Sequence, residues 1–477
     1  MSDKHVAQDT SGHVQLRSVL YLPGTQRYSG SRVYQGISMS KYSSLMVAVL
    51  VLMLSGCANK VWIADWKETT PFSGPRAGTA SVVVKDKLYL IGGVDGKNFV
   101  NITEYAQINK DGTLGEWVRG YPLFEERGFM EAVVHGDFVY VVGGGKGENG
   151  HTLLRTAERA RIREDGTLGP WMTEKNEMVV TRRCSKIIAA NNRLYSFGGY
   201  GGVLLDTVEY AEILPDGSLG EWQLDSEYMT LPRYVNSVKK EDDRFFIIGG
   251  HDQTKGVGIT DVEWTRYTPE GNTQIWQATT PMQQGRYGLS SSAYGDFMYA
   301  IGGLSGAEYL DSIEVTEVGK DGSLKPWRYT TPLDQSRANF SSIDHKGRLY
   351  IIGGTNRSGY LSSVIYADHN SAGDLGYWGT KEDAKALEVK LAERAAFKSQ
   401  LPHVGQVVEF IQAAAYTYIH VRNDIGQQVW IAGQKIEDIK VGDTIGFSTG
   451  VTMTNWYSKE LKRGFDMVLF VGTVRKQ

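Results

Sequence analysis

The chain has 477 residues, of which 41% are apolar and 22% charged, so it is long enough for two or more domains and has an ordinary globular composition. A net charge of −3 and a pI near 6.3 argue against a nucleic-acid binder, because such proteins need clustered Lys and Arg to displace counterions from phosphates. The 56 glycines and 26 tyrosines against only 12 prolines predict many tight turns between aromatic-bearing strands, which favours an all-β protein.

An export signal is predicted near the N-terminus. Lys41 precedes an apolar run from Leu45 to Leu54, which is about half of the ~20 apolar residues that a helix needs to cross a bilayer. A short run after a positive charge is typical of a signal peptide rather than of a permanent transmembrane helix. We therefore expect residues 39–56 to be a signal peptide, and residues 1–38 to be an overextended N-terminus with Met39 as the true start.

The apolar run closes on Leu54-Ser55-Gly56-Cys57, which resembles the lipobox of bacterial lipoproteins. The resemblance implies that Cys57 is acylated, that the preceding residues are removed, and that the protein is anchored to a membrane instead of spanning it. Ala58 stands where an Asp would retain such proteins in the inner membrane, so the resemblance implies the outer membrane of the bacterial cell envelope. With Cys57 lipidated, Cys184 has no partner for an intramolecular disulfide.

The most informative feature is an internal repeat, in which six apolar segments ending in a glycine pair recur at spacings of 51, 55, 51, 53 and 51 residues. The segments are LYLIGG (Leu88–Gly93), VYVVGG (Val139–Gly144), LYSFGG (Leu194–Gly199), FFIIGG (Phe245–Gly250), MYAIGG (Met298–Gly303) and LYIIGG (Leu349–Gly354). Sixteen residues before the first glycine of each pair stands an arginine: Arg76, Arg127, Arg182, Arg233, Arg286 and Arg337. Downstream comes a tryptophan, usually in a segment such as Asp-Gly-Thr-Leu-Gly-Glu-Trp: Trp117, Trp171, Trp222, Trp276, Trp327 and Trp378.

Each repeat is expected to form four short strands. In the first copy these are Ala80–Val84, Lys87–Ile91, Thr103–Ile108 and Leu114–Val118, with a type I′ hairpin turn at Asp111-Gly112. One four-stranded sheet per ~50 residues is a propeller blade. The glycine pairs, arginines and tryptophans together resemble the kelch family over roughly residues 60–378, which implies a six-bladed kelch-type β-propeller.

One tryptophan element is surplus to six blades. Trp66 with Thr69-Thr70-Pro71 matches Trp327 with Thr330-Thr331-Pro332. Either Trp66 or Trp378 must then lie outside the ring or cover an edge. We favour an N-terminal strand that completes the last blade, although Trp378 lies in an intact Leu-Gly-Tyr-Trp segment and competes equally well.

The pattern changes after the last repeat. Apolar residues at helical spacing in Lys381–Gln400 predict an amphipathic helix or linker. About five strands follow, which predicts a small C-terminal β-barrel of the OB or SH3-like kind. They are expected at Val404–Ile411, Tyr416–Val421, Gln428–Ile431, Thr444–Phe447 and Met467–Val474. This part also resembles small exported bacterial domains, some of them linked with nitrite reductase systems; we expect Met453 to pack there rather than to bind a soft metal.

The six arginines have two interpretations. As a ring near the central channel they would bind an anionic ligand such as a sugar acid. Alternatively, each arginine braces its own blade, which we favour because a residue present in every unit more often serves what every unit shares. Recognition is then expected in residues that differ between blades, above all in the loops after the glycine pairs. These loops are Asp95–Asn98, Lys146–His151, His251–Lys255, Gly306–Tyr309 and Asn356–Tyr360.

Motifs for a cofactor are weak. Gly145–Gly150 matches the dinucleotide glycine pattern, but its sister positions are loops before a strand, whereas a nucleotide fingerprint must open a helix. His151 and His251 occupy comparable loops and are candidate ligand-binding residues, yet two isolated histidines do not make a metal site. We predict no nucleotide, no cofactor and no metal.

Two functions stay open at this point. The first is a non-catalytic binding scaffold, exported and lipid-anchored, whose propeller face engages a protein or glycan. The alternative is a sugar-acid mutarotase or epimerase, because some exported bacterial kelch proteins are sialic-acid mutarotases; a pair of carboxylates near the channel mouth would support it. Glu104, Glu209 and Glu314 are the positions to inspect, although their repetitive spacing indicates a structural role. The expected boundaries are 1–38 for the extension, 39–56 for the signal peptide, 57–378 for the propeller, 379–402 for the linker and 403–477 for the barrel.

Overall fold

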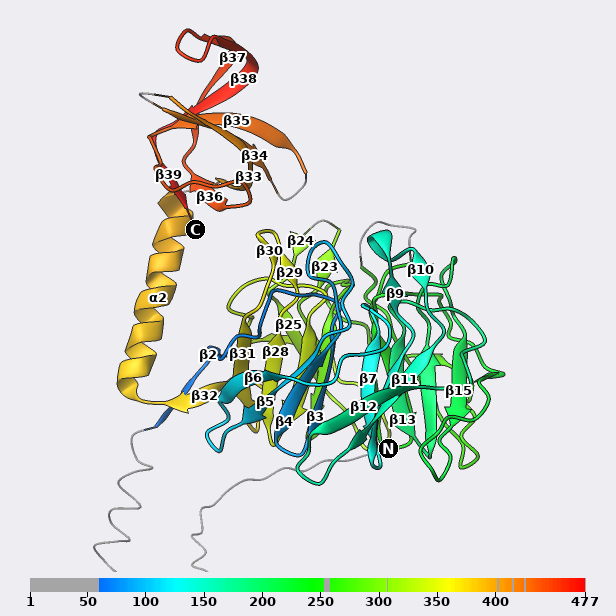
Figure 1. Cartoon of the computed structure of the whole chain (residues 1–477). Helices are drawn as coiled ribbons and strands as arrows, with labels where there is room; N and C mark the ends of the chain where they lie inside the picture. The colour runs from blue at the N-terminus through cyan, green and yellow to red at the C-terminus, as the bar shows by residue number, and fades with distance from the viewer. Residues whose placement is uncertain are drawn as a thin grey trace, which may run out of the picture. The chain divides into compact units, whose positions relative to one another are not determined.

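The computed structural model describes residues 60–252, 258–306, 308–400, 403–413, 416–423 and 426–476. Cys57 and the predicted signal peptide lie outside these residues. The described chain forms a ring of β-sheets, then one long helix, then a second β-structure (Figure 1). Within the described ranges no helix is long and apolar enough to cross a membrane.

The first five blades of the ring have four antiparallel strands each, and the sixth is a six-stranded antiparallel sheet. The innermost strands are β3 (Ala80–Val84), β7 (Glu131–His135), β13 (Lys186–Ala190), β17 (Ser237–Glu241), β21 (Ser290–Tyr294) and β27 (Ser341–His345). The second strands are β4 (Lys87–Ile91), β8 (Phe138–Val142), β14 (Arg193–Phe197), β18 (Arg244–Ile248), β22 (Phe297–Ile301) and β28 (Arg348–Ile352). The third strands are β5 (Thr103–Ile108), β11 (Ala157–Ile162), β15 (Val208–Glu212), β19 (Val262–Arg266), β25 (Ile313–Glu317) and β31 (Val364–His369). The outer strands of the first five blades are β6 (Leu114–Arg119), β12 (Leu168–Thr173), β16 (Gln223–Leu224), β20 (Gln277–Ala278) and β26 (Arg328–Thr330).

The innermost strands contact one another around the whole ring, and β27 returns to β3. The six-bladed propeller predicted from the repeats is therefore confirmed. Three short hairpins lie together at one end of the propeller, which we call the loop face (Figure 1). They are β9 (Gly145–Lys146) with β10 (Thr152–Leu153), β23 (Leu304–Ser305) with β24 (Glu308–Tyr309), and β29 (Thr355–Asn356) with β30 (Gly359–Tyr360), and a 3-10 turn η1 (Glu148–Gly150) joins β9 to β10.

Packing between blades explains the apolar run before each glycine pair. The second strands are buried on both sides, because each blade is covered by its two neighbours; Leu88, Leu90 and Ile91 are all 0% exposed. Six apolar clusters fill the six junctions between blades. The propeller core is therefore divided among its junctions rather than gathered at one centre.

A repeated tyrosine explains the recurrent Asp-Gly turn. The hydroxyl of Tyr89 in the first blade donates to the carbonyl of Gly166 in the next blade at 2.9 Å, and Tyr140 donates likewise to Gly217 at 2.7 Å. The expected type I′ geometry is wrong, because Gly112 has φ 82° while Asp111 is not among the positive-φ residues. The Gly112 N–H instead donates to the Asn109 carbonyl, so the glycine closes a three-residue loop. The Gly112 carbonyl then accepts a hydrogen bond from the Tyr350 hydroxyl in a neighbouring blade at 2.7 Å.

The sixth blade is closed by both ends of the propeller chain. Strand β2 (Lys67–Thr69) pairs with one half of β31, and β32 (Leu375–Gly379) pairs with the other half. Strand β1 (Val61–Ile63) then pairs with β32. Trp66 takes the buried tryptophan position, with its Nε1–H donating to the Pro332 carbonyl at 2.8 Å, as Trp327 donates to Thr280. The favoured N-terminal closure is therefore observed, and it includes a half-strand from the C-terminal side.

The two competing tryptophans differ in burial, which makes a matched pair of variants. Trp66 is 6% exposed, whereas Trp378 is 57% exposed and, among the aromatic rings of the described residues, contacts Trp62 alone, edge-on. We expect Trp66→Ala to lower the free energy of unfolding by about 3–5 kcal/mol, as for a buried large-to-small change. Trp378→Ala should cost below about 1 kcal/mol. Urea unfolding of residues 58–477 followed by circular dichroism checks both values, and equal losses would contradict this account of ring closure.

The chain after the propeller forms a helix and a closed sheet. Thr380 caps the N-terminus of helix α2 (Lys381–Gln400). The Thr380 Oγ1 accepts from the Asp383 N–H at 3.2 Å, and the Asp383 carboxylate accepts from the Thr380 N–H at 2.8 Å. Among residues 381–392, Ala384 and Leu387 are half-buried, whereas Val389 and Leu391 are 50% and 52% exposed. A helix is present over the residues for which an amphipathic helix or linker is expected.

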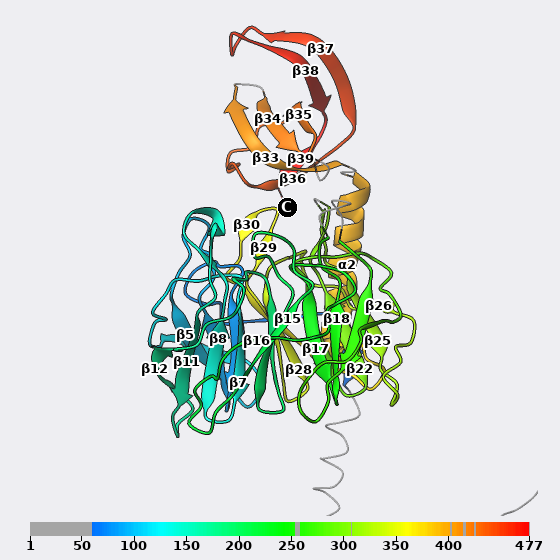
Figure 2. The same cartoon turned by 90° about the vertical axis from the view of Figure 1, so that its right-hand side faces the viewer.

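The C-terminal sheet closes on itself (Figure 2). Its strands are β33 (His403–Gln412), β34 (Thr417–Arg422), β35 (Gln428–Gly433), β36 (Thr444–Phe447), β37 (Gly450–Ser458), β38 (Arg463–Val471) and β39 (Val474–Lys476). Because β36 runs directly into β37 and β38 into β39, each pair acts as one bent strand, and β36 returns to β33 to complete a small barrel. Strand β37 was missing from the sequence prediction, because nearly all its side chains are exposed and give no alternating pattern.

Candidate functional site

The repeated arginine is the anchor of every blade. All six side chains are 0–2% exposed, and in each blade the Nη1–H donates to the carbonyl of the first glycine of the pair at 2.9–3.3 Å. In five blades the guanidinium also pairs with a glutamate on the third strand: Glu104, Glu158, Glu209, Glu263 and Glu314. In the sixth blade Ile365 occupies this register, and Arg337 pairs with Asp334 at 3.2 Å.

The arginine backbone couples each blade to the one before it. The second glycine of the pair in one blade donates its N–H to the arginine carbonyl of the next blade, as Gly93 does to Arg127 at 2.8 Å and Gly354 to Arg76 at 2.9 Å. Both glycines have positive φ, 58° and 102° in the first blade. A Cβ on Gly92 would lie 2.4 Å from the Arg127 carbonyl oxygen. The glycine pair is therefore required by close contact between blades.

This geometry favours the bracing role over the anionic-ligand role for the six arginines. Each guanidinium is enclosed in its own blade, and its glutamate is committed to it, so Glu104, Glu209 and Glu314 are not an acid–base pair at a channel mouth. Burial lowers the pKa of the Arg182 guanidinium, and Glu209 opposes that shift.

Removing one arginine tests the brace. Arg182→Met leaves the Glu209 carboxylate, 0% exposed, without its counter-charge and should cost about 3–5 kcal/mol of unfolding free energy. The control is Arg155→Met, which breaks the exposed pair with Glu177 and should cost below about 1 kcal/mol. Urea midpoints of the two variants give the comparison; a small effect of Arg182→Met would show that the brace is dispensable.

A ring of left-handed residues surrounds the channel axis on the loop-face side of the innermost strands. The residue two positions after each arginine has φ between 47° and 59°. These axial-ring residues are Gly78, Phe129, Cys184, Val235, Gly288 and Asn339. Five of the six junctions carry a backbone bond between ring members, such as the Phe129 N–H to the Gly78 carbonyl at 2.7 Å. Among the described hydrogen bonds, the matching one from Val235 to Cys184, between blades three and four, is absent.

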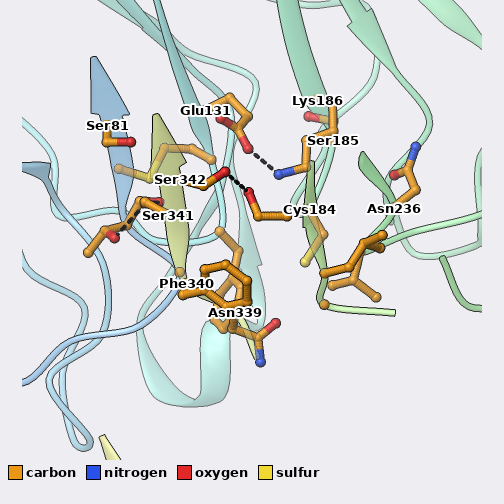
Figure 3. Close-up of a pocket in the computed structure, with 18 residues that line it drawn as sticks. Ser81, Glu131, Cys184, Ser185, Lys186, Asn236, Asn339, Phe340, Ser341 and Ser342 are labelled. Atoms are coloured by element: carbon orange, nitrogen blue, oxygen red, sulfur yellow. Dashed lines mark hydrogen bonds and ion pairs between the residues drawn. The ribbon is translucent and has the colours of Figure 1, made fainter. Parts of the chain in front are cut away.

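Directly beneath this ring lies an axial cavity of about 80 Å³ to which all six blades contribute (Figure 3). Its lining is largely polar. Glu131 and Lys186 point toward one another and form an ion pair between blades two and three. Further along the axis, burial lowers the pKa of the Lys239 ammonium, while Asp344 and Glu131 oppose the shift. The cavity therefore has compensated charge rather than a cationic wall.

An arc of large side chains borders the axial ring on one side only. Its side chains come from two positions of the repeat, the residue after the arginine and the residue after the glycine pair. These two residues form a β-bridge in every blade. Blades three, four and five carry Arg183 with Tyr200, Tyr234 with His251, and Tyr287 with Leu304. The other three blades carry small or aliphatic pairs, namely Ala77 with Val94, Gly128 with Gly145, and Ala338 with Thr355.

The arc members contact one another in sequence around the axis. We define the aromatic arc as Arg183, Tyr200, Tyr234, His251 and Tyr287, all half-buried. Its ring centroids are 6.3 Å apart for Tyr200 and Tyr234, 5.7 Å for Tyr234 and His251, and 4.8 Å for His251 and Tyr287. The Arg183 guanidinium lies 5.3 Å from the Tyr200 ring. The arc is thus a continuous amphipathic surface over three blades.

Of the predicted histidines, only His251 belongs to this arc. His151 is exposed at the end of η1 in blade two, so the structure does not bring the two histidines into one site. The loops predicted for recognition include His251 but not the other arc members Arg183, Tyr234 and Tyr287. Comparing the position after the arginine across the six repeats would have found them, because large residues stand there in three adjacent copies.

The described residues offer little for nucleophilic or metal chemistry. No group of three or more His, Cys, Asp or Glu side chains that would hold a metal ion occurs within the described ranges. Burial raises the pKa of the Cys184 thiol to about 12, so its reactive thiolate is scarce near neutral pH.

The comparisons with known proteins agree with the fold. Residues 75–105 match the kelch motif. Kelch repeat and BTB domain-containing protein 1 of horsepox virus is 27% identical over 208 residues, which are 42% of this chain and 34% of that protein. Kelch-like protein 36 of Bos taurus is 25% identical over 286 residues, 58% of this chain and 43% of that protein. The matches thus span well under two thirds of these relatives' length.

A solved structure extends the match to a whole propeller. The structure of YjhT superposes with a TM-score of 0.53 at 14% identity, covering 65% of this chain and 99% of that chain. At this identity the likeness shows the fold alone. Fold, repeats and motif together define a six-bladed kelch-type β-propeller carrying a C-terminal barrel.

Proposed function

We propose that this chain is an exported bacterial lipoprotein, anchored to the outer membrane through Cys57, that acts as a non-catalytic scaffold and binds a protein or glycan at the loop face. The observation that carries the proposal is the aromatic arc. Aromatic rings with polar edges, together with Arg183, are the residue types that dominate recognition surfaces. The arc residues stand at repeat positions where three other blades have small or aliphatic residues, so the propeller does not need large side chains there to fold.

The C-terminal barrel gives the scaffold a second module. Its parallel contact between β35 and β38, within an otherwise antiparallel barrel, supports the OB alternative over the SH3-like one. OB barrels bind ligands through their strands and loops. We propose that this module contributes to partner binding.

The mutarotase alternative needs a general acid and a general base at the channel mouth. The lining of the axial cavity contains one carboxylate, Glu131, which is paired with Lys186. The scaffold is therefore the better-supported function, and selective binding of an acidic sugar would revive the enzyme.

Lipid attachment has a direct test. Intact-mass analysis of the membrane-extracted protein should give a chain that begins at Cys57 and carries two or three acyl chains. Cys57→Ser should give an unlipidated protein. Its extraction should no longer require detergent. A mature protein that retains residues 39–56 would contradict the lipoprotein proposal.

The arc has a binding test with a matched control. Residues 58–477 should capture a partner from cell-envelope extracts or bind on a glycan array. Tyr234→Ala and Tyr287→Ala should each weaken that binding about tenfold or more, because a buried aromatic anchor contributes over ~1 kcal/mol. Tyr329→Ala, on outer strand β26 and 49% exposed, should leave it unchanged. Equal binding by all three variants would exclude the arc as the binding surface.

A chain that ends near Trp378 separates the two modules. Retained binding assigns recognition to the propeller alone, and lost binding shows that the barrel is required.

A further inference from the structure

Among the described residues, the junction between blades three and four lacks the polar side-chain bridge that four other junctions have at the level of the axial cavity. Polar side chains bridge four junctions there. The pairs are Glu131 with Lys186 between blades two and three, Ser237 with Ser291 between four and five, Ser290 with Ser342 between five and six, and Thr79 with Ser341 between six and one. The three hydroxyl pairs have oxygen–oxygen distances of 2.6, 2.7 and 2.9 Å.

At the junction of blades three and four the polar side chains have no partner. Ser185 is 1% exposed and Asn236 is 0% exposed, and both line the axial cavity. Neither the Ser185 hydroxyl nor either atom of the Asn236 amide makes a hydrogen bond within the described chain. The backbone bond between Val235 and Cys184 is absent at the same junction. A buried amide without partners is costly unless something else satisfies it.

The unpartnered groups connect directly to the aromatic arc. Arg183-Cys184-Ser185 and Tyr234-Val235-Asn236 are equivalent three-residue segments of neighbouring blades. In each segment the first residue belongs to the arc, the second to the axial ring and the third to the cavity. Cys184 and Val235 are half-buried, as are Phe129 and Asn339 of the axial ring. A ligand on the arc therefore lies next to the ring residues that line the cavity.

The chemistry of the cavity selects a neutral hydroxyl group. The Asn236 amide offers one acceptor and two donor hydrogens, and the Ser185 hydroxyl both donates and accepts. A carboxylate leaves the amide oxygen unsatisfied and an ammonium leaves the amide nitrogen unsatisfied, whereas a hydroxyl serves both. The Lys186 charge is already neutralised by Glu131. The volume of about 80 Å³ is several times the ~10–15 Å³ that one water molecule needs on the same measure of cavity volume, enough for one hydroxyl-bearing arm of a sugar.

We infer that the loop face binds a neutral saccharide, which stacks on the tyrosines of the arc and inserts one hydroxyl-bearing arm into the axial cavity to bond with Asn236 and Ser185. The inference rests on the proposed function and names its ligand class. The apolar C–H face of a sugar suits an aromatic ring, and its hydroxyls suit the tyrosine edges and the amide.

The test uses residues 58–477 on an array of neutral and acidic oligosaccharides, followed by calorimetric titration with the best neutral one. Asn236→Leu has nearly the same shape without the amide and should weaken binding at least tenfold. Its unfolding midpoint should be unchanged or raised, because an unpartnered amide is removed. The control is Ser341→Ala, which lines the same cavity but uses its hydroxyl on Thr79, and it should change affinity less than twofold.

Each outcome is decisive. If Asn236→Leu binds the saccharide normally while Tyr234→Ala does not, the arc is the site and the inserted arm is wrong. If no neutral saccharide binds but a protein partner is captured through Tyr234, or if only acidic sugars bind, the saccharide inference falls and the loop-face site survives. If Asn236→Leu destabilises the protein and no saccharide binds, the amide holds water only. Failure of every ligand and partner to respond to Tyr234→Ala overturns the proposed function itself.

Discussion

The buried arginine of each repeat is the interaction on which the propeller depends. Its guanidinium fixes the glycine-pair carbonyl of its own blade, and its backbone carbonyl accepts from the glycine pair of the blade before. The Arg182 charge is tolerated in the interior because Glu209 neutralises it and its remaining donors are bonded to Gly198 and Thr207. The same contact, made six times, sets the spacing of the blades and positions the residues that follow each arginine around the axis.

A ring built this way separates structural from recognition residues. The repeated arginine, glycine pair, tyrosine and tryptophan make the hydrogen bonds between blades. The positions beside them are therefore free to vary. Three adjacent blades use that freedom to present Arg183, Tyr234 and Tyr287, and two of them place unpartnered polar groups just below. Function in a repeat protein of this type is therefore found where the repeats disagree, and here the disagreement is confined to one side of the axis.

The electrostatics of the axis favour recognition over acid–base catalysis. The repeated glutamates form ion pairs with the arginines, and Glu131 forms one with Lys186. The one carboxylate that lines the axial cavity is therefore paired with a cation. Cys184, which sits in the axial ring, has a thiol whose pKa burial raises to about 12. A surface of tyrosine edges above neutral polar groups fits the uncharged ligand that we propose.

The sequence alone determined the blade count and the bounds of strands such as β3, β4 and β5, because these follow from a local pattern repeated six times. It favoured the bracing role of the arginines but left the anionic-ligand role open. It could not choose between Trp66 and Trp378, since both lie in intact repeat segments and only burial in the folded sixth blade, 6% against 57% exposed, separates them. It named His251 but did not group it with Tyr234 and Tyr287, because the contacts that bring these three rings together form only on folding. The sequence also could not predict that the buried Asn236 amide lacks a hydrogen-bond partner. Its possible partners are side chains of neighbouring blades, and only the tertiary structure brings these together.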